Sequence, residues 1–322
     1  MQIQPCGPLR GEITVPGDKS ISHRAVMLGA LANGTPHITG FLMGEDCLST
    51  IDCFRKMGVE INITDDEVIV EGVGLHGLEA PSEALYTGNS GTTTRLLCGI
   101  LAGQPFTVTM SGDPSIQKRP MGRVMKPLRE MGASIEGKND NFCPLTLYPS
   151  ELHGIEYRLP VASAQLKSAI LLAGLYAEGQ TTVIEPAPSR DHTERMFRAL
   201  GVEIETNGST ITLDPPEDRH AVDIAVPGDI SSAAFFLVAG AIIPGSELTI
   251  KNVGVNPTRT GVLDVLRDMG ADITESNFRD EAEPMCDLTV KYSKLHGVEI
   301  GGAIIPRLID ELPVIAVAAA FA

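Results

Sequence analysis

Positively charged side chains occur at predicted helix starts (Lys19, Arg24 and Lys167) and in loops (Lys118, Arg119 and Arg190), in a chain whose overall charge is strongly negative. The formal net charge is −16, with 25 Lys and Arg against 41 Asp and Glu. A cation at a helix N-terminus is disfavoured by the helix dipole. Its presence there, beside backbone N–H groups and Ser or Thr hydroxyls, therefore predicts a site that binds an anion.

Each of these residues taken singly is also compatible with a solvated turn. Solvated turns do not explain a whole set of such residues, because equivalent turns of repeated units are expected to converge at a shared axis. That set comprises Lys19, Arg24, Arg119, Ser163, Gln165 and Arg190. We therefore expect one shared site for anionic groups.

The elements that position these residues recur along the chain, at a period of roughly seventy residues. A Leu-x-Gly step opens the copies at Leu9, Leu75, Leu152 and Leu295. A polar turn and an apolar helix follow, then a β-rich run, a second helix and two further strands. Each unit is predicted as βαβαββ, and self-similarity of this length indicates a repeat architecture.

The first helix of each unit is predicted to be buried. Residues 20–31, 169–175 and 233–243 are apolar on nearly every face. A helix of that kind in a soluble protein is surrounded by other elements. Glycines at 34, 103, 179 and 245 are predicted to end the first helices of the four units in the left-handed conformation.

The composition and the pattern of apolar residues argue against several classes of protein. No apolar stretch approaches the roughly 18 to 20 residues of a membrane span, and Met1-Gln2-Ile3-Gln4 reads as a strand rather than a signal peptide. A cytoplasmic protein is therefore expected. Six cysteines form no Cys-x-x-Cys pair, which predicts reduced thiols and no metal site. The acidic balance argues against a nucleic-acid partner.

The number of repeats predicts the domain organisation. Three units close a domain of about 200 residues, and the chain holds four units and the start of a fifth. We expect a complete domain at residues 16–226 and a second, incomplete domain made of residues 1–15 and 227–322. About 100 further residues are expected after Ala322, since the chain ends within an apolar helix.

Several motifs, in order along the whole chain, resemble the EPSP synthase family (3-phosphoshikimate 1-carboxyvinyltransferases). They are residues 16–25 (PGDKSISHRA), 88–95 (GNSGTTTR), 117–122 (QKRPMG), 163–169 (SAQLKSA), 189–194 (SRDHTE) and 306–313 (PRLIDELP). The SAQ and SRDHT forms resemble the bacterial subgroup called class II. The resemblance implies an α/β fold of two domains, each with three βαβαββ units arranged as an inside-out α/β barrel. The active site would lie between the domains, the second of which is truncated here.

The implied reaction transfers the enolpyruvyl group of phosphoenolpyruvate to the 5-hydroxyl of shikimate 3-phosphate, in the shikimate pathway to aromatic amino acids. Two phosphates and two carboxylates would share one site, which a cluster of cations and helix N-termini would stabilise. The resemblance implies no cofactor and no metal, and a monomer is expected. It also implies that glyphosate occupies the phosphoenolpyruvate site. Insensitive class II relatives carry alanine at the position of Gly91, so this chain is expected to be sensitive.

The resemblance also implies the roles of individual residues. Shikimate 3-phosphate would be bound by Lys19, Ser20, Arg24, Ser163, Ala164, Gln165, Arg190 and Asp310. Phosphoenolpyruvate would be bound by Lys19, Asn89, Gly91, Arg119 and Gln165. Asp310, as general base, and Lys19 would be catalytic. From the residues alone, Asp310 is also compatible with an acid that stabilises a helix N-terminus.

Three other readings remain. A UDP-N-acetylglucosamine enolpyruvyl transferase would carry a loop cysteine where this chain has Pro114, and Lys-Asn in place of Lys19-Ser20. RNA 3′-phosphate cyclases share related repeats but would need a basic face. The third reading is a catalytically incomplete shikimate 3-phosphate-binding fragment. The family's later Lys-Glu-Ser-Asp-Arg segment and its final Arg and Lys have no counterpart before Ala322.

Overall fold

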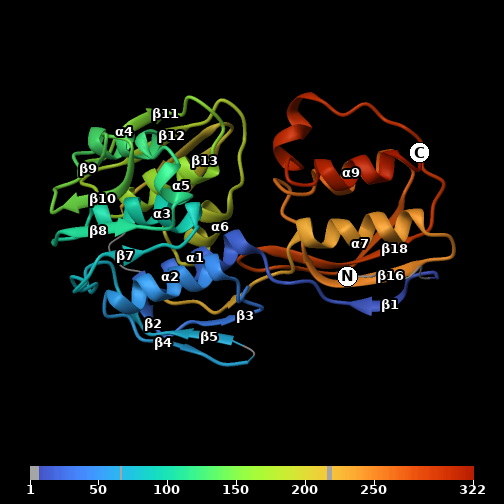
Figure 1. The fold of residues 1–322 in the computed structure, drawn as a ribbon, viewed down its shortest axis with the longest axis horizontal. Coiled ribbons are helices and arrows are strands. Elements are labelled where there is room, and N and C mark those ends of the chain that lie inside the picture. Colours follow the sequence, from blue (N-terminus) through green and yellow to red (C-terminus); the bar gives the residue numbers. More distant parts are fainter. Residues whose placement is uncertain (1–6, 66, 216–219) are drawn as a thin grey trace. The chain divides into compact units, whose positions relative to one another are not determined.

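The computed structural model describes residues 7–65, 67–215 and 220–322 (Figure 1). The strand predicted at residues 1–4, and Cys6, lie outside these ranges. The chain divides into two compact units. Unit 2 is Lys19–Ala225, and unit 1 combines residues up to Asp18 with Val226–Ala322.

Unit 2 contains three four-stranded sheets that share one topology. In spatial order, the first two strands of each sheet are parallel, and the third strand is antiparallel to both of its neighbours. In the first sheet the edge strand comes last in the sequence. The sheets are, in spatial order, β15(Ile224–Ala225)-β3(His37–Thr39)-β5(Glu67–Val70)-β4(Ile61–Ile63), β7(Leu85–Tyr86)-β8(Val108–Ser111)-β10(Phe142–Tyr148)-β9(Ser134–Lys138) and β11(Glu156–Arg158)-β12(Thr181–Ile184)-β14(Thr210–Leu213)-β13(Ile204–Asn207). A short pair, β2 (Asn33–Gly34) and β6 (Gly72–Val73), joins the first repeat. The sheets confirm the predicted βαβαββ unit.

Two helices accompany each sheet of unit 2. The first helices are α1 (Lys19–Leu31), α3 (Gly91–Ala102) and α5 (Ala164–Gly174); the second are α2 (Glu45–Lys56), α4 (Gly122–Glu130) and α6 (His192–Ala199). A 3-10 turn, η1 (Ile116–Lys118), precedes α4. The first helices are buried almost throughout, as predicted; every residue of α1 from Ile21 to Leu31 is buried. Apolar side chains on all faces leave these helices no solvated side.

The described residues of unit 1 form one sheet, ordered β1(Arg10–Ile13)-β16(Glu247–Gly254)-β18(Pro284–Lys291)-β17(Asp272–Asp280). Its helical segments are α7 (Ile230–Ile242), α8 (Gly261–Asp268), η2 (Gly302–Arg307) and α9 (Leu312–Ala319). β1 runs parallel to β16, although the two strands lie at distant points of the sequence. Ala233, Leu237, Ile250 and Leu288 are among the residues at the centre of its apolar core.

The two similar Pro-Gly-Asp segments lie against each other at the points where the chain passes from one unit to the next. The N–H of Asp18 donates to the carbonyl of Pro227 at 2.8 Å, and the N–H of Asp229 donates to the carbonyl of Pro16 at 2.9 Å. Gly17 and Gly228 form an antiparallel bridge. The repeat of the sequence motif therefore reflects reciprocal backbone pairing.

Two local predictions were wrong. Gly103, which ends α3, has φ −94° and is not left-handed. A Cβ there would lie 2.2 Å from the ring of Tyr176, so close packing is what requires glycine. On α7, Phe235 and Phe236 are exposed, at 62% and 41%, although the helix was predicted to be buried on every side. The described elements of unit 1 leave that side of α7 uncovered.

Among the described residues, no helix is long and apolar enough to span a membrane.

Candidate active site

Arg24 lies deep in unit 2 and joins three helices. It is 4% exposed, and its Nε donates to Thr193 Oγ1 at 2.8 Å. One terminal nitrogen donates to the carbonyl of Ser20 at 2.9 Å and the other to Ser168 Oγ at 2.8 Å. The hydroxyls of Ser168 and Thr193 lie 2.7 Å apart. The guanidinium is thus held in one orientation by polar groups of α1, α5 and α6.

The N-termini of α3 and α5 meet through polar side chains. Gln165 accepts a hydrogen bond from Arg95 at 2.8 Å, and its own amide donates to Thr92 Oγ1 at 3.0 Å. Each helix is capped by a serine, because Ser90 Oγ accepts from the N–H of Thr93 and Ser163 Oγ from that of Leu166. Capping by a serine hydroxyl satisfies one of the free N–H groups of the first turn. Ser163 and Ala164, both half-buried, lie at the start of α5.

Gly91 lies against two guanidinium groups. A Cβ at this position would be 2.8 Å from a terminal nitrogen of Arg95 and 3.0 Å from one of Arg119. Arg119 also donates to Asn89 Oδ1 at 2.6 Å, which joins the loop after β8 to the turn before α3. The glycine therefore allows two cations to approach one helix N-terminus.

Cations at this point repel one another. Burial, followed by the charges of Arg123 and Arg119, lowers the pKa of Arg95 to about 10. Nε of Arg95 is buried and has no hydrogen-bond partner. A group of three arginines with a buried, unused donor favours a bound anion. The sequence did not identify Arg123 as a site residue. It placed Arg95 in a family motif but predicted no role for it, although Arg95 lies one helical turn after Gly91.

Lys19 begins α1 and is exposed, with Nζ 3.5 Å from Asp46 of α2. The loose contact and the exposure leave the ammonium available to a ligand. Arg190 is half-buried in the loop between β12 and α6. Unit 2 therefore brings together Ser20, Arg24, Ser163 and Gln165 through α1 and α5, with Asn89, Gly91 and Arg119 joined to them through α3.

Lys167 does not belong with the anion-binding cations, so that prediction was wrong. The side chain is 1% exposed, and Nζ lies 2.9 Å from Glu185 Oε2 and 2.7 Å from Glu194 Oε1. Both carboxylates are also buried. The cation is neutralised inside the protein, because an unpaired buried charge would be very costly.

Asp310 belongs to unit 1, where it is exposed just before α9. The next residue, Glu311, is buried and accepts a hydrogen bond from Ser231, and its Oε1 lies 3.4 Å from Arg259. Arg259 also lies 3.4 Å from Asp229 and 3.9 Å from Asp18. Burial, and then Asp18, raise the pKa of Asp229. This acidic cluster around one arginine, which no pattern in the sequence predicted, fixes the chain next to Asp310.

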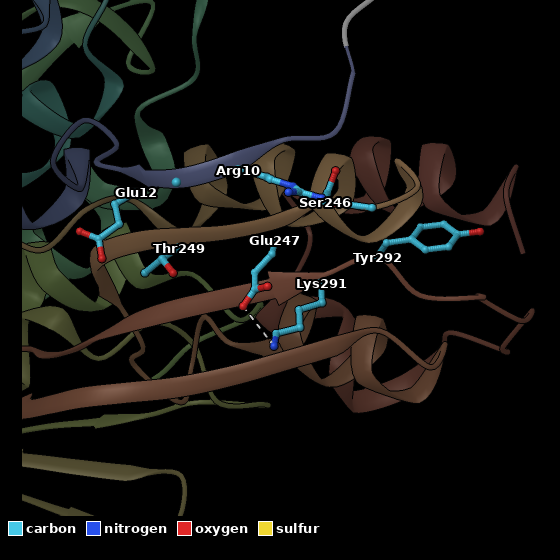
Figure 2. A pocket seen from close by; sticks show the side chains of 9 residues that line it. Arg10, Glu12, Ser246, Glu247, Thr249, Lys291 and Tyr292 are labelled. Carbon is cyan, nitrogen blue, oxygen red and sulfur yellow. Dashed lines mark hydrogen bonds and ion pairs between the residues drawn. The ribbon is translucent and has the colours of Figure 1, made fainter.

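A separate hollow of about 660 Å³ lies on the sheet of unit 1 (Figure 2). Its charges are mixed, and Lys291 and Glu247 pair across it at 3.1 Å. None of the candidate residues lines it. In the described part of the chain, no cluster of three or more His, Cys, Asp or Glu side chains could hold a metal ion.

The repeats and the anion-binding turns are those of a known group of enzymes. A sequence model of the family EPSP synthase (3-phosphoshikimate 1-carboxyvinyltransferase) matches residues 3–322. This chain belongs to that family.

Individual relatives agree with this assignment. A protein of Geobacillus thermodenitrificans named 3-phosphoshikimate 1-carboxyvinyltransferase is 62% identical over 313 residues, which are 97% of this chain and 72% of that protein. One of the same name from a Thermoanaerobacter species is 56% identical over 315 residues, covering 98% and 74%. The solved EPSP synthase of Acinetobacter baumannii superimposes with a TM-score of 0.93 at 51% identity, covering 98% of this chain and 72% of that one.

Proposed function

We propose that this protein acts as a 3-phosphoshikimate 1-carboxyvinyltransferase, transferring the enolpyruvyl group of phosphoenolpyruvate to the 5-hydroxyl of shikimate 3-phosphate. The observation that carries the proposal is the convergence of cations and helix N-termini in unit 2, in a chain of the EPSP synthase family. Both proposed substrates are multiply charged anions. Fixed N–H donors and guanidinium groups stabilise such anions without reorganising during the reaction.

Shikimate 3-phosphate is assigned to the part of the site around Arg24. The first turn of α5 contributes Ser163, Ala164 and Gln165. Further hydrogen-bond donors come from Ser20, Arg24 and Arg190. Because Ser168 and Thr193 hold the guanidinium of Arg24, little side-chain entropy is lost when the ligand binds.

Phosphoenolpyruvate is assigned to the N-terminus of α3. Arg119, Asn89, Gly91 and Gln165 lie there, and Lys19 contributes an ammonium to both ligands. The charge of the substrate would relieve the repulsion among Arg95, Arg119 and Arg123.

The chemistry proposed is an addition followed by an elimination. The substrate hydroxyl adds to C2 of phosphoenolpyruvate while the methylene carbon gains a proton and becomes a methyl group. The tetrahedral intermediate then loses inorganic phosphate from C2 and a proton from that methyl group, which restores the carbon–carbon double bond. Asp310 is assigned as the base that takes the hydroxyl proton, and Lys19 as a cation that stabilises the charge that develops. Both roles rest on the family resemblance.

The test is substrate-dependent release of phosphate, with the second product identified by mass spectrometry. Arg119→Met should abolish most turnover, whereas Arg158→Met, which changes an exposed arginine on β11, should not. The decisive assay uses a protein that spans the full length of the relatives, and absence of product from both substrates at millimolar concentration in that protein would reject the proposal. Turnover with UDP-N-acetylglucosamine in place of shikimate 3-phosphate would instead favour the sister transferase.

We further propose that the protein is a monomer in the cytoplasm. Light scattering coupled to size-exclusion chromatography would measure the mass in solution. Cell fractionation would show the compartment.

A further inference from the structure

A fully buried ion triad lies beside the proposed shikimate 3-phosphate site. Lys167, on the first turns of α5, contacts Glu185 at the end of β12 and Glu194 on α6, at 2.9 and 2.7 Å. The three side chains are at most 4% exposed. One cation therefore joins three elements that are separate in the sequence.

Stability alone is a weak explanation for this triad. Buried ion pairs can often be replaced by apolar residues of similar size at little cost, because desolvation offsets the attraction. The triad also carries one carboxylate more than it has cations, and Oε2 of Glu194 has no hydrogen-bond partner. Burial, opposed by Lys167, raises the pKa of Glu194. An arrangement with an unsatisfied oxygen calls for a reason beyond packing.

The position of the triad supplies such a reason. Glu185 and Glu194 stand at the two ends of the loop that carries Arg190. The second oxygen of Glu185 accepts the hydroxyl of Ser189, the residue directly before Arg190. The loop is thus bound through Lys167 at both of its ends to α5, the helix that carries Ser163 and Gln165. Ser189 is linked to α5 indirectly, through Glu185.

We propose that Lys167, Glu185, Glu194 and Ser189 form a positioning device that fixes the position of Arg190 relative to the N-terminus of α5. Lys167 acts through the loop and does not touch the ligand. The inference rests on the proposed function in that it takes Arg190 as a ligand for shikimate 3-phosphate. A donor displaced by about 1 Å no longer makes a well-formed hydrogen bond to its ligand, so a rigid loop matters for binding.

The test is a double-mutant cycle on shikimate 3-phosphate affinity, measured by calorimetry with the 322-residue chain. Ser189→Ala cuts the link to the loop without changing any charge, and should weaken binding about 3- to 10-fold. In an Arg190→Ala background, the same substitution should change the affinity by less than about twofold. Ser293→Ala, which removes a hydroxyl bonded to the backbone in unit 1, is the matched control and should have no effect.

Lys167→Met should weaken shikimate 3-phosphate binding more than Ser189→Ala does, by up to roughly 150-fold, which is the full contribution of a charged hydrogen bond, if that variant folds. Lys251→Met, which removes the cation beside the buried Asp287 of unit 1, is its control. Equal losses from Ser189→Ala in both backgrounds, or no loss with Arg190 present, would overturn the inference.

Hydrogen exchange separates failure of this inference from failure of the proposed function. The loop has amide protons at Ala187, Ser189, Arg190 and Asp191. They should exchange faster in Ser189→Ala than in the parent chain, with no ligand present. If the parent chain does not bind shikimate 3-phosphate, the assigned function fails. Unchanged exchange in the variant refutes the positioning device itself.

Discussion

Replacing Gly91 with alanine should reduce inhibition by glyphosate, which the family resemblance assigns to the phosphoenolpyruvate site. The added Cβ would lie 2.8 Å from Arg95 and 3.0 Å from Arg119, in both cases from a terminal guanidinium nitrogen. Both distances are shorter than ordinary van der Waals contact, so each nitrogen must move by about half an ångström. The ends of arginine side chains can make such a shift, and the fold should therefore be unaffected.

The shift of Arg119 and the volume of the methyl group both act on the bound anion. One new clash in a pocket changes relative binding by about 1–3 kcal/mol, which is roughly 10- to 200-fold. The parent protein should be inhibited in competition with phosphoenolpyruvate, and Gly91→Ala should raise the inhibition constant by a factor in that range. The KM for phosphoenolpyruvate should rise less, because that ligand is shorter than the inhibitor.

The assay compares inhibition constants and KM values for the parent, Gly91→Ala and Gly297→Ala. Gly297 has open space where a Cβ would lie, so Gly297→Ala controls for the loss of backbone freedom alone. An inhibition constant unaltered by Gly91→Ala would refute the steric reasoning. A parent protein that resists glyphosate would refute the expected sensitivity.

Three further predictions concern catalysis, binding and stability. Asp310→Asn should lower turnover by roughly 10²- to 10⁴-fold while leaving shikimate 3-phosphate affinity nearly intact; an equal loss of affinity would indicate a positioning role. The residues assigned to bind shikimate 3-phosphate lie mostly in unit 2, so calorimetry should detect binding of shikimate 3-phosphate to the chain. Arg24→Met should weaken that binding by about 10- to 150-fold. Absence of a binding signal at millimolar shikimate 3-phosphate would contradict this prediction. A hydrogen bond that the ring N–H of His37 donates to Glu67, and then the charge of Glu67, raise the pKa of His37, so folding favours protonated His37. The resulting contribution of His37 to the free energy of unfolding is fully present below about pH 6.5, and it is lost as the pH rises through the raised pKa. Denaturant titrations should therefore show His37→Gln less stable than the parent near pH 6 and equal to it near pH 9.

Local patterns in the sequence predicted the repeat well. The β-rich run predicted after a first helix is a strand in the structure, for example β3 and β12, because alternation and flanking turns define a short strand locally. Gly179 and Gly245 have positive φ, as predicted. Such signals depend on residues that are close in the chain.

What could not be predicted depends on partners from distant elements. Lys19 and Lys167 both lie in first helical turns, yet Lys19 is exposed and Lys167 is neutralised by two acids, one just after β12 and one on α6. Spacing along the chain cannot distinguish the two. Gly103 was misjudged for the same reason, since its constraint is the ring of Tyr176, far away in sequence. The acids around Arg259 likewise come from three separate segments.

The pairing of β1 with β16 has a consequence for synthesis on the ribosome. The hydrogen bond between the N–H of Leu9 and Ser246 Oγ spans 237 residues. At typical translation rates, about 12 to 50 s pass before the nascent N-terminal strand meets its neighbour. During that interval all of Lys19–Ala225 emerges, including β15, the strand that completes its first sheet. Unit 2 can therefore fold first, while β1 waits with an unpaired edge that nascent-chain chaperones would have to shield.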